Sequence, residues 1–482
     1  MLFIFILFLA GCTVGPNFQA PITPATQQYT SPWTSDSVKT AGPLAPRFVY
    51  GRDIPAEWWK VFQCAPLDKV IRLALAGSPT LDAAQATLRQ AREEYNADTG
   101  AAFYPAVDAG FSASRQKISN SAFGQSGGKG TIFNLLHPSI NVAYFFDFFG
   151  GARRELESLR AKVNYQQFQM EAAALTLTSN IVAAVGKEVA LRAQLEAWYA
   201  ILDGQEQQLK MLEQQFTAGG VSRFDVLSQK TRMEQTRSAF PPLEKELAFT
   251  RHQLSVLIGK MPGEEADLPV FHMEDIKLPA ELPVTLPSAL ARQRPDIRAA
   301  EELLAAASAK IGAAQAAFYP QVTLTGSYGP QANRAGDLFK ENNLVGNITA
   351  GIFQPLFNGG ELRAKRRQAD AVYDEAAAVY RQTILLAFQN VADVLRALEA
   401  DAAAIKTQFD TIAAAKETLD MAQKQFQAGA VSHLALLDAQ RQFEQARIGV
   451  IQAQAQRFTD TAALFQALGG GWMGRAGIGD RR

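Results

Sequence analysis

The stretch from Ile384 to Phe426 reads ILLAFQNVADVLRALEADAAAIKTQFDTIAAAKETLDMAQKQF and contains no proline. An apolar residue recurs there at every seventh position: Ile384, Val391, Leu398, Ile405, Ile412, Leu419 and Phe426. This spacing keeps the side chains on one helix face, and sustained heptads are typical of helices that coil against neighbours. Because no proline follows Pro355, a single helix from Gly359 to Ala428 would span about 100 Å. No single globular core needs a rod of that length, so we expect the helix to cross a space.

The same pattern occurs earlier in the chain. Short segments recur in the same order at an offset of about 210 to 216 residues: Ser78–Ala84 with Arg294–Ala300, Ala101–Pro105 with Ala316–Pro320, Phe149–Gly151 with Phe357–Gly360, and Gln215–Ser222 with Gln425–Ser432. The chain is therefore an internal duplication, and a repeat of this size governs the fold. We assign repeat 1 to residues 61–260 and repeat 2 to residues 291–468, joined by an irregular, proline-rich equatorial segment over residues 261–290.

The composition argues against nucleic-acid binding and against catalysis. Lysine and arginine balance aspartate and glutamate, so the net charge is zero and no basic surface is expected. The four histidines, His137, His252, His272 and His433, form no metal-ligand spacing, and no nucleophile motif or phosphate-binding loop occurs. We therefore predict that the protein is not an enzyme and holds no metal or cofactor.

The N-terminal residues Met1–Cys12 read MLFIFILFLAGC. This apolar run is too short for a membrane-spanning helix and is typical of a secretory signal. It ends in Leu9-Ala10-Gly11-Cys12, which resembles the bacterial lipobox, so we predict a signal peptide over residues 1–11 and a covalent lipid on Cys12. The absence of Lys or Arg before the run departs from that pattern, and a chance cysteine after an ordinary signal is the alternative. By resemblance to lipoprotein sorting, Thr13 indicates the outer membrane.

The ends of the chain lack periodicity. Residues 12–60, rich in proline, threonine and serine before Trp58-Trp59, are predicted to form a lipid-anchored extended tether. The glycine-rich residues 469–482 are predicted to form a flexible tail. Cys64 has no partner if Cys12 is lipidated, and we interpret it as a small, partly buried residue.

Two regions switch to a period of two, which predicts β-hairpins at about residues 102–148 and 317–355. Val107, Ala109 and Phe111 alternate with Asp108, Gly110 and Ser112, for example. Strands that are apolar on one face and small and polar on the other suit a membrane barrel around a wet lumen, although a soluble, half-buried sheet is the alternative. Four strands are too few to close a barrel, and an open edge is not tolerated in lipid. Several copies of the chain must then share one barrel.

Each strand pair leads into a long α-helical hairpin, at about residues 150–260 and 357–468. At the first tip, Ser222 and Asp225 form an S-x-x-D capping box, and Ser432 is expected to cap its helix likewise. Asp438 lies farther along the second return helix. In a single chain it would be an ordinary solvated acid, but in a symmetric oligomer it would form a ring of carboxylates that selects cations.

Together, the lipobox, Trp58-Trp59, the duplicated hairpins and the two Ala-Gly-x-Val-Ser tips resemble the outer membrane factors, the TolC-like exit ducts of efflux pumps. The segment Leu254–Pro262 is similar to their NodT-type lipoprotein branch. The resemblance covers almost the whole chain after Cys12. It implies a mainly α fold with β: a homotrimer with four transmembrane strands per chain, a 12-strand β-barrel and a periplasmic α-barrel.

The resemblance also implies partners and site residues. A periplasmic adaptor would link the duct to an inner-membrane transporter of the RND type, and the barrel would contact outer membrane lipid. Leu434 and Asp438 match the positions of the periplasmic aperture in similar ducts. Asp225 matches an acid that in some members binds a Tyr and an Arg of a neighbouring tip, but this sequence has Phe426 and Val431 there. Ala435 replaces a second aperture acid of TolC.

We therefore predict a passive outer membrane exit duct for small molecules in a tripartite efflux system. A type I protein secretion duct is one alternative. A structural coiled-coil lipoprotein is another, although a spacer of that kind would need no strands.

Overall fold

The computed structural model describes residues 13–22, 28–29, 47–52, 54–119, 130–264 and 268–471. Cys12 and the predicted signal peptide lie outside these residues. The backbone contacts divide the chain into two units. We call residues up to Pro21, Thr87–Gln167 and Ala299–Tyr380 the sheet unit, and Ile22–Ala86, Phe168–Arg298 and Arg381–Arg482 the hairpin unit. Each unit takes pieces from both sequence repeats.

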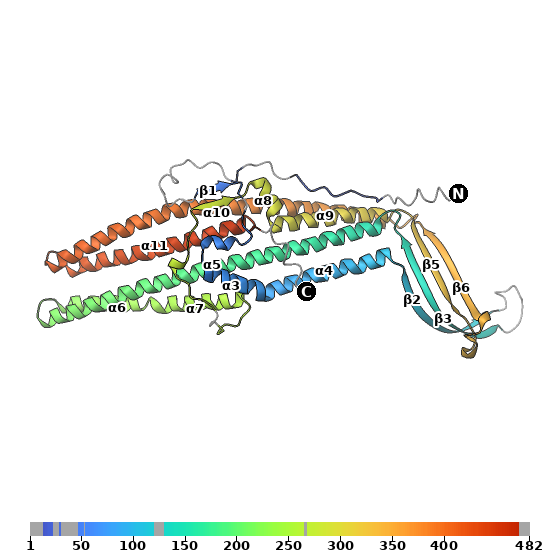
Figure 1. Cartoon of the computed structure of the whole chain (residues 1–482), viewed down its shortest axis with the longest axis horizontal. Helices are drawn as coiled ribbons and strands as arrows, with labels where there is room; N and C mark the ends of the chain where they lie inside the picture. Colours follow the sequence, from blue (N-terminus) through green and yellow to red (C-terminus); the bar gives the residue numbers. More distant parts are fainter. Residues whose placement is uncertain are drawn as a thin grey trace. The chain divides into compact units, whose positions relative to one another are not determined.

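The sheet unit is built on four antiparallel strands in the order β2-β3-β5-β6 (Figure 1). Their bounds are Ala106–Ile118 for β2, Thr131–Phe146 for β3, Gln321–Pro330 for β5 and Leu344–Phe353 for β6. Both hairpins predicted from the period of two are therefore present. The outer strands β2 and β6 each pair on one side only, so both edges of the sheet are open in a single chain.

The strand register gathers the apolar side chains on one face of this sheet. Directly opposed residues share a face, and Val107 lies opposite Val142, Gly326 opposite Ile348, and Val322 opposite Ile352. Ile348 and Ile352 are 84% and 76% exposed in the single chain. An apolar face this exposed, between two open edges, requires another apolar medium and further strands.

A helix adjoins each strand in the sequence. Helix α4 (Pro79–Phe103) leads into β2 and α9 (Pro295–Ala316) leads into β5, while β3 and β6 are followed by α5 (Gly151–Thr217) and α10 (Glu361–Gln427). Helices α5 and α9 pack closely because the residues between them are small and buried, including Ala161 of α5 and Ala307 of α9. Asn164 of α5 donates to Glu302 of α9 at 3.2 Å, and Lys310 of α9 pairs with Glu155 of α5.

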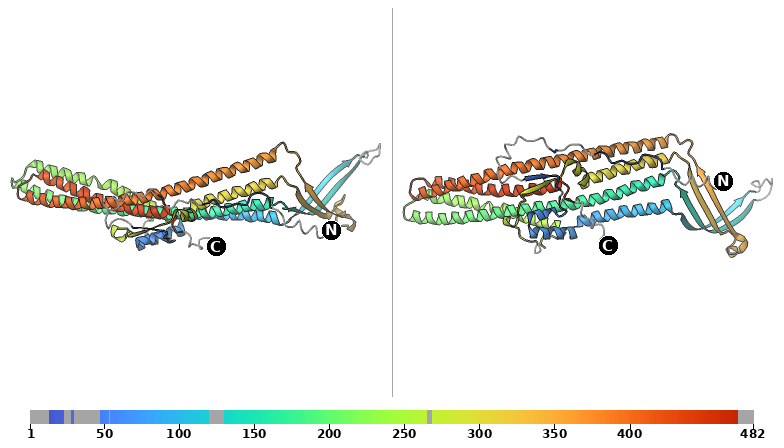
Figure 2. Two further views of the ribbon diagram at one scale, coloured as in Figure 1. Left: turned by 90° about the horizontal axis from the view of Figure 1, so that it is seen from above. Right: turned by 45° about the horizontal axis from the view of Figure 1, so that its top comes forward.

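The hairpin unit contains the return helices of both repeats. In Figure 2, α6 (Arg223–Arg237) runs back beside α5, and α11 (His433–Ala467) runs back beside α10. The first return path continues as α7 (Phe240–Leu257), whose first turn accommodates Pro241 and Pro242. The heptad residues Ile384, Val391, Leu398 and Ile405 are buried, whereas Ile412, Leu419 and Phe426 are half-buried toward the tip.

The core of the hairpin unit forms around the tryptophan pair. The 3-10 helix η3 (Trp58–Phe62) places Trp58 in a stack on Phe465, with ring centroids 5.4 Å apart. The indole N–H of Trp59 donates to Asp68 of α3 (Ala65–Gly77) at 2.8 Å. Cys64 is 5% exposed and belongs to the same core. Both tryptophans are therefore structural anchors of this unit.

The structure corrects the predictions for three irregular segments. Within the tether, Arg47–Tyr50 forms strand β1, which pairs in parallel with β4 (Glu281–Val284) of the connecting segment. The connecting segment also contains the one-turn helix η6 (Met273–Asp275), and α8 (Pro287–Gln293) begins within it. At the start of the tail, Gly469–Gly471 have positive φ and lie against Arg294, Trp58 and Pro55. Local sequence could not reveal these pairings because the partners lie far apart in the chain.

Candidate functional site at the hairpin tips

The two tip turns are built alike. Helix α5 ends at Thr217 and α10 at Gln427, and each is followed by a glycine in the left-handed region, Gly219 at φ +78° and Gly429 at φ +71°. The next residue closes the helix in both turns: Gly220 N donates to Gln215 O and Ala430 N to Gln425 O, each at 2.8 Å. The duplication read from the sequence thus extends to individual hydrogen bonds.

The capping box predicted at the first tip is present. Ser222 Oγ accepts from Asp225 N at 3.2 Å, and Ser222 N donates to Asp225 Oδ2 at 3.0 Å. The hydrogen bond from the Ser222 side chain holds the pKa of Asp225 below its ordinary value. At the second tip Ser432 Oγ accepts from Ala435 N at 3.4 Å, and Ala435 offers no side chain to complete the box. The first return helix is therefore capped more completely than the second.

Leu434 and Asp438, the predicted aperture residues, lie one turn apart on the same exposed face of α11. The Leu434 side chain is 71% exposed. Asp438 Oδ1 accepts from Arg441 Nη2 at 2.6 Å, and Oδ2 accepts from Gln442 Nε2 at 2.8 Å. The bond from Arg441 is the main reason that the pKa of Asp438 lies below its ordinary value. Asp438 is therefore ionised, but Arg441 partly compensates its charge.

A polar bridge between the two hairpins was not predicted. Arg232 of α6 donates from Nη1 to Leu437 O at 2.6 Å and from Nη2 to Glu444 Oε2 at 3.1 Å. Gln205 Nε2 of α5 donates to Glu444 Oε1 at 3.3 Å, and Gln440 Nε2 of α11 donates to Gln208 Oε1 at 2.7 Å. The Arg232 and Glu444 side chains are only 16% and 13% exposed. The pairing joins repeat 1 to repeat 2, and no local motif marks it.

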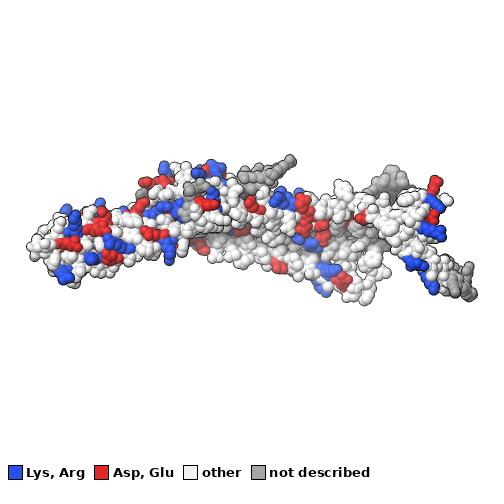
Figure 3. Space-filling view, turned by 90° about the horizontal axis from the view of Figure 1, so that it is seen from below, with Lys and Arg blue, Asp and Glu red and all other residues white. Residues whose placement is uncertain are grey.

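A groove of 840 Å³ runs beside this bridge. It is lined by residues of α5, α10 and α11, among them seven glutamines: Gln205, Gln207, Gln208, Gln215, Gln423, Gln427 and Gln440. Around the tips, side chains of both charge signs are interspersed on the surface (Figure 3). Apolar side chains such as Ile201, Leu212 and Phe443 line the groove as well, and Glu444 and Arg447 are its charged members.

His433, the first residue of α11, is a second feature that sequence reasoning missed. Its side chain is 6% exposed and its ring packs against Phe426, with centroids 5.4 Å apart. Neither ring nitrogen has a hydrogen-bond partner among the described residues. Burial lowers the pKa of His433, and the nearby Asp225 carboxylate opposes that shift. A neutral imidazole therefore fills the inside of the second tip.

The described residues contain no cluster of three or more metal-ligating side chains. The tips combine two similar turns, the exposed residues Leu434 and Asp438, and the Arg232–Glu444 ion pair.

Comparisons with known proteins agree with this architecture. The family model described as outer membrane efflux protein matches residues 70–260 and 286–470, one segment for each repeat. The chain is 33% identical over 424 residues to the pyoverdine export outer membrane protein OpmQ of Pseudomonas aeruginosa, covering 86% of this chain and 87% of that protein. It is 28% identical over 474 residues to the cation efflux system protein CusC of Escherichia coli, covering 97% of each.

Solved structures give the same result. The outer-membrane channel OprN aligns with a TM-score of 0.85 at 28% identity, covering 96% of this chain and all of that chain. The open-state MtrE outer membrane channel of Neisseria gonorrhoeae aligns with a TM-score of 0.81 at 26% identity, covering 96% and 99%. The predicted fold class, a duplicated chain with long helical hairpins and four barrel strands that assembles as a trimer, is confirmed. The chain belongs to the outer membrane efflux protein family, the channels that carry the cargo of tripartite pumps across the outer membrane.

Proposed function

We propose that this channel is a passive duct for small molecules that is anchored by lipid on Cys12 and opened at its hairpin tips. The observation that carries the proposal is the open four-stranded sheet with one exposed apolar face. Strands of that kind are stable in a membrane only when further copies close the barrel. A coiled-coil spacer lipoprotein would have no use for such a sheet. A water-filled passage supplies no energy of its own, so transport must be driven by a partner.

The partners that fit are a periplasmic adaptor and an inner-membrane transporter of the RND type. The tips are the natural contact point because they end the helical hairpins. Among the relatives, OpmQ is named for pyoverdine export, TtgC for toluene efflux and CusC for cation efflux. Those cargoes are small, which favours small molecules over the protein cargo of a type I secretion duct. The proposal includes no catalytic role and no cofactor besides the lipid.

The aperture proposal concerns Leu434 and Asp438 of α11. In a closed trimer, three copies of the Leu434–Asp438 face would form an apolar ring and an acidic ring around one axis. Ser222, Asp225 and Ser432 would fix the turns that hold these rings in place. Asp438 would then favour cations, to the extent that Arg441 leaves its charge uncompensated.

The experiment that tests the duct is export in cells that lack their own outer membrane channel but retain an adaptor and pump. Restored efflux of a small fluorescent dye, without release of a type I secretion substrate, would support the proposal. Release of the protein alone would favour the secretion duct. Labelling with radioactive palmitate tests the anchor: wild type should incorporate label and Cys12→Ser should not, and equal labelling of both would refute lipidation at Cys12.

A further inference from the structure

The residues just after Cys12 do not extend freely but are docked on the sheet unit. Val14 N donates to Phe149 O at 3.1 Å. Arg154 of α5 donates from Nε to Val14 O at 3.2 Å and from Nη2 to Gly15 O at 3.3 Å and Asn17 Oδ1 at 2.8 Å. We call Thr13–Asn17 the N-terminal strap. Backbone and side-chain bonds together hold it along its length.

Arg154 is built into the unit as the centre of this contact. Its side chain is 4% exposed, and Nη1 donates to Glu157 Oε2 at 2.7 Å. All three guanidinium nitrogens therefore have acceptors, which a buried arginine needs because its charge has lost water. Three of the four acceptors belong to the strap: Val14 O, Gly15 O and Asn17 Oδ1. Removing the strap would leave these N–H groups without those partners.

Three glycines allow the strap to approach. Gly15 has φ +96°, and a Cβ atom there would lie 2.3 Å from the Cα atom of Gly312 on α9. A Cβ atom on Gly312 would lie 2.9 Å from Arg154 Cγ, and one on Gly150 would lie 2.5 Å from Thr13 Cγ2. A Cβ atom closer than 3.0 Å to another atom would force neighbouring atoms to move. The strap therefore fits only because these three residues are glycines. The surfaces of the strap, α5 and α9 are therefore complementary in shape at this point.

The duplication shows that this match is specific to repeat 1. Helices α5 and α10 both have 67 residues and begin at positions 151 and 361, so Arg154 corresponds to Ala364. Ala364 is exposed, and its methyl group cannot donate the hydrogen bonds that Arg154 makes. The pairing of Ala101 with Ala316 likewise relates Gly312 to Ala97. The chain has two equivalent sites but only one N-terminal strap, and only one site carries the arginine and the glycine.

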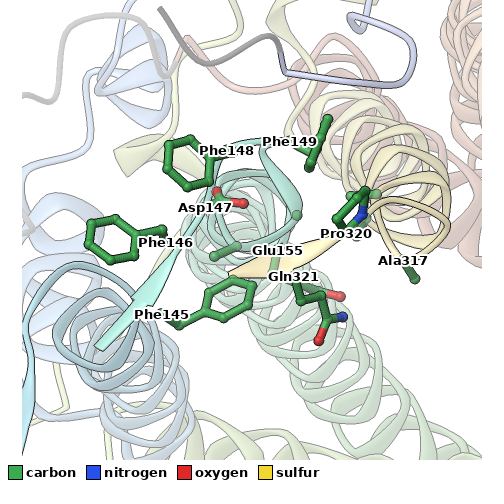
Figure 4. Close-up of a pocket in the computed structure, with 13 residues that line it drawn as sticks. Phe145, Phe146, Asp147, Phe148, Phe149, Glu155, Ala317, Pro320 and Gln321 are labelled. Atoms are coloured by element: carbon green, nitrogen blue, oxygen red, sulfur yellow. The ribbon is translucent and has the colours of Figure 1, made fainter. Parts of the chain in front are cut away.

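The strap lies next to an aromatic cluster at the end of β3. Phe146 and Phe148 stack with centroids 5.6 Å apart, and Phe149, whose carbonyl binds the strap, stacks on Tyr319 at 4.7 Å. Phe146, Phe148 and Phe149 line the cavity in Figure 4, together with Pro320. Aromatic side chains at strand ends are typical of the level at which a barrel meets the membrane surface.

We propose that Arg154, Gly150 and Gly312 form a docking socket for the N-terminal strap, and that this socket fixes a lipid on Cys12 at the membrane-surface level of the sheet. The positioning role rests on the lipid anchor proposed above. Thr13 is the neighbour of Cys12 in the chain, so holding Thr13 limits how far the attachment point can move. The acyl chains would then enter the inner leaflet beside the barrel instead of at the end of a long tether.

Proteolysis of intact, detergent-extracted trimers tests the socket. Phe18, half-buried just after the strap, is a chymotrypsin site that can be followed by mass spectrometry. Because cleavage requires local opening, its rate reports how firmly the strap is docked. Arg154→Ala and Gly15→Ala should each speed cleavage after Phe18 by about tenfold relative to wild type. The control Arg363→Ala, an exposed α10 residue near the equivalent site, should cleave like wild type.

Equal cleavage rates in wild type, Arg154→Ala and Gly15→Ala would overturn the socket. If Arg154→Ala fails to form trimers, Gly15→Ala decides the matter, because Gly15 lies outside every helix and strand. Palmitate labelling of the same samples separates the two proposals. An unlabelled wild type with a protected Phe18 would remove the lipid anchor and the positioning role while leaving the docked strap. A labelled wild type that is cleaved rapidly after Phe18 would support the lipid anchor and overturn the docked strap.

Discussion

Arg232 of the first hairpin and Glu444 of the second form an ion pair at 3.1 Å in a largely buried setting. Burial raises the pKa of Glu444, and the Arg232 charge and hydrogen bond oppose that shift. The pair therefore stabilises Glu444 as a carboxylate where an unpaired acid would tend to take up a proton. Because it joins the two repeats of one chain just behind the tips, it is placed to hold the hairpins together.

Replacing Arg232 with Ala should loosen the tips. The change leaves the Glu444 carboxylate partly buried without its cation, at a cost of about 2 kcal/mol. We expect a lower melting temperature of the trimer and a larger single-channel conductance. The control Arg237→Ala removes an arginine on the same helix whose ion pairs with Glu206 and Glu234 are half-exposed, so it should change either quantity little. A conductance that stays at the wild-type value in Arg232→Ala would show that the pair does not restrain the tips.

Replacing Asp438 with Ala should reduce the cation preference of the channel. Asp438 is exposed on α11, and Arg441 neutralises part of its charge. Arg441→Ala should therefore shift selectivity the opposite way, toward cations, which a purely structural role would not produce. Reversal potentials across a salt gradient measure both changes, with Asp420→Ala on the exposed surface of α10 as the control. Unchanged reversal potentials in both variants would remove Asp438 from the aperture.

Sequence periodicity was a good guide wherever the structure is regular and local. The seven-residue row from Ile384 to Ile405 is buried as expected, and the alternation around Val107 marks the apolar face of the sheet. The Ser222–Asp225 box was predictable because its partners lie three residues apart. Such features depend on neighbours that a single stretch of sequence contains.

Several of the features that sequence missed depend on distant partners. Arg232 and Glu444 are 212 residues apart, and Arg154 lies 137 residues from Asn17. Strand β1 looked like tether because its partner β4 lies 234 residues away. In hindsight, the offset of 210 residues between the two tips, Gln215–Ser222 and Gln425–Ser432, relates Arg154 to Ala364. A difference of this kind between the repeats marks a site where the copies have different neighbours.

The two faces of the edge strand β6 should respond differently to charge. Ile348 lies on the apolar face and Thr349 on the polar face, and both are exposed in the single chain. A lysine on the lipid face of a barrel costs about 2–4 kcal/mol at the membrane midplane, whereas a lumen position is wet. Ile348→Lys should therefore lower the yield of heat-resistant trimer in outer membranes, and Thr349→Lys should preserve it while changing conductance. The opposite pattern would mean that the apolar face lines the lumen.

Asp401 of α10 should make the trimer less stable as the pH rises. Burial, then the charge and hydrogen bond of Asp460 on α11, raise the pKa of Asp401 to about 7, while Arg457 opposes the shift. A carboxyl whose pKa is raised by folding contributes stability below its unfolded value, and that contribution is lost as the pH rises through about 7. Asp401→Asn, which mimics the protonated acid, should match wild type at pH 4 and exceed it at pH 8 by about 1–2 kcal/mol after allowance for solvent screening.

Melting temperatures of wild type, Asp401→Asn and the control Asp393→Asn, measured from pH 4 to pH 8, check this prediction. Asp393 is exposed on the same helix, so its amide variant should follow the wild-type curve. The Asp401→Asn curve should be the flatter one, because the group that loses its proton between those pH values has been removed. Parallel curves for all three proteins would mean that Asp401 is already ionised at low pH, and that Arg457 outweighs both its burial and the neighbouring Asp460.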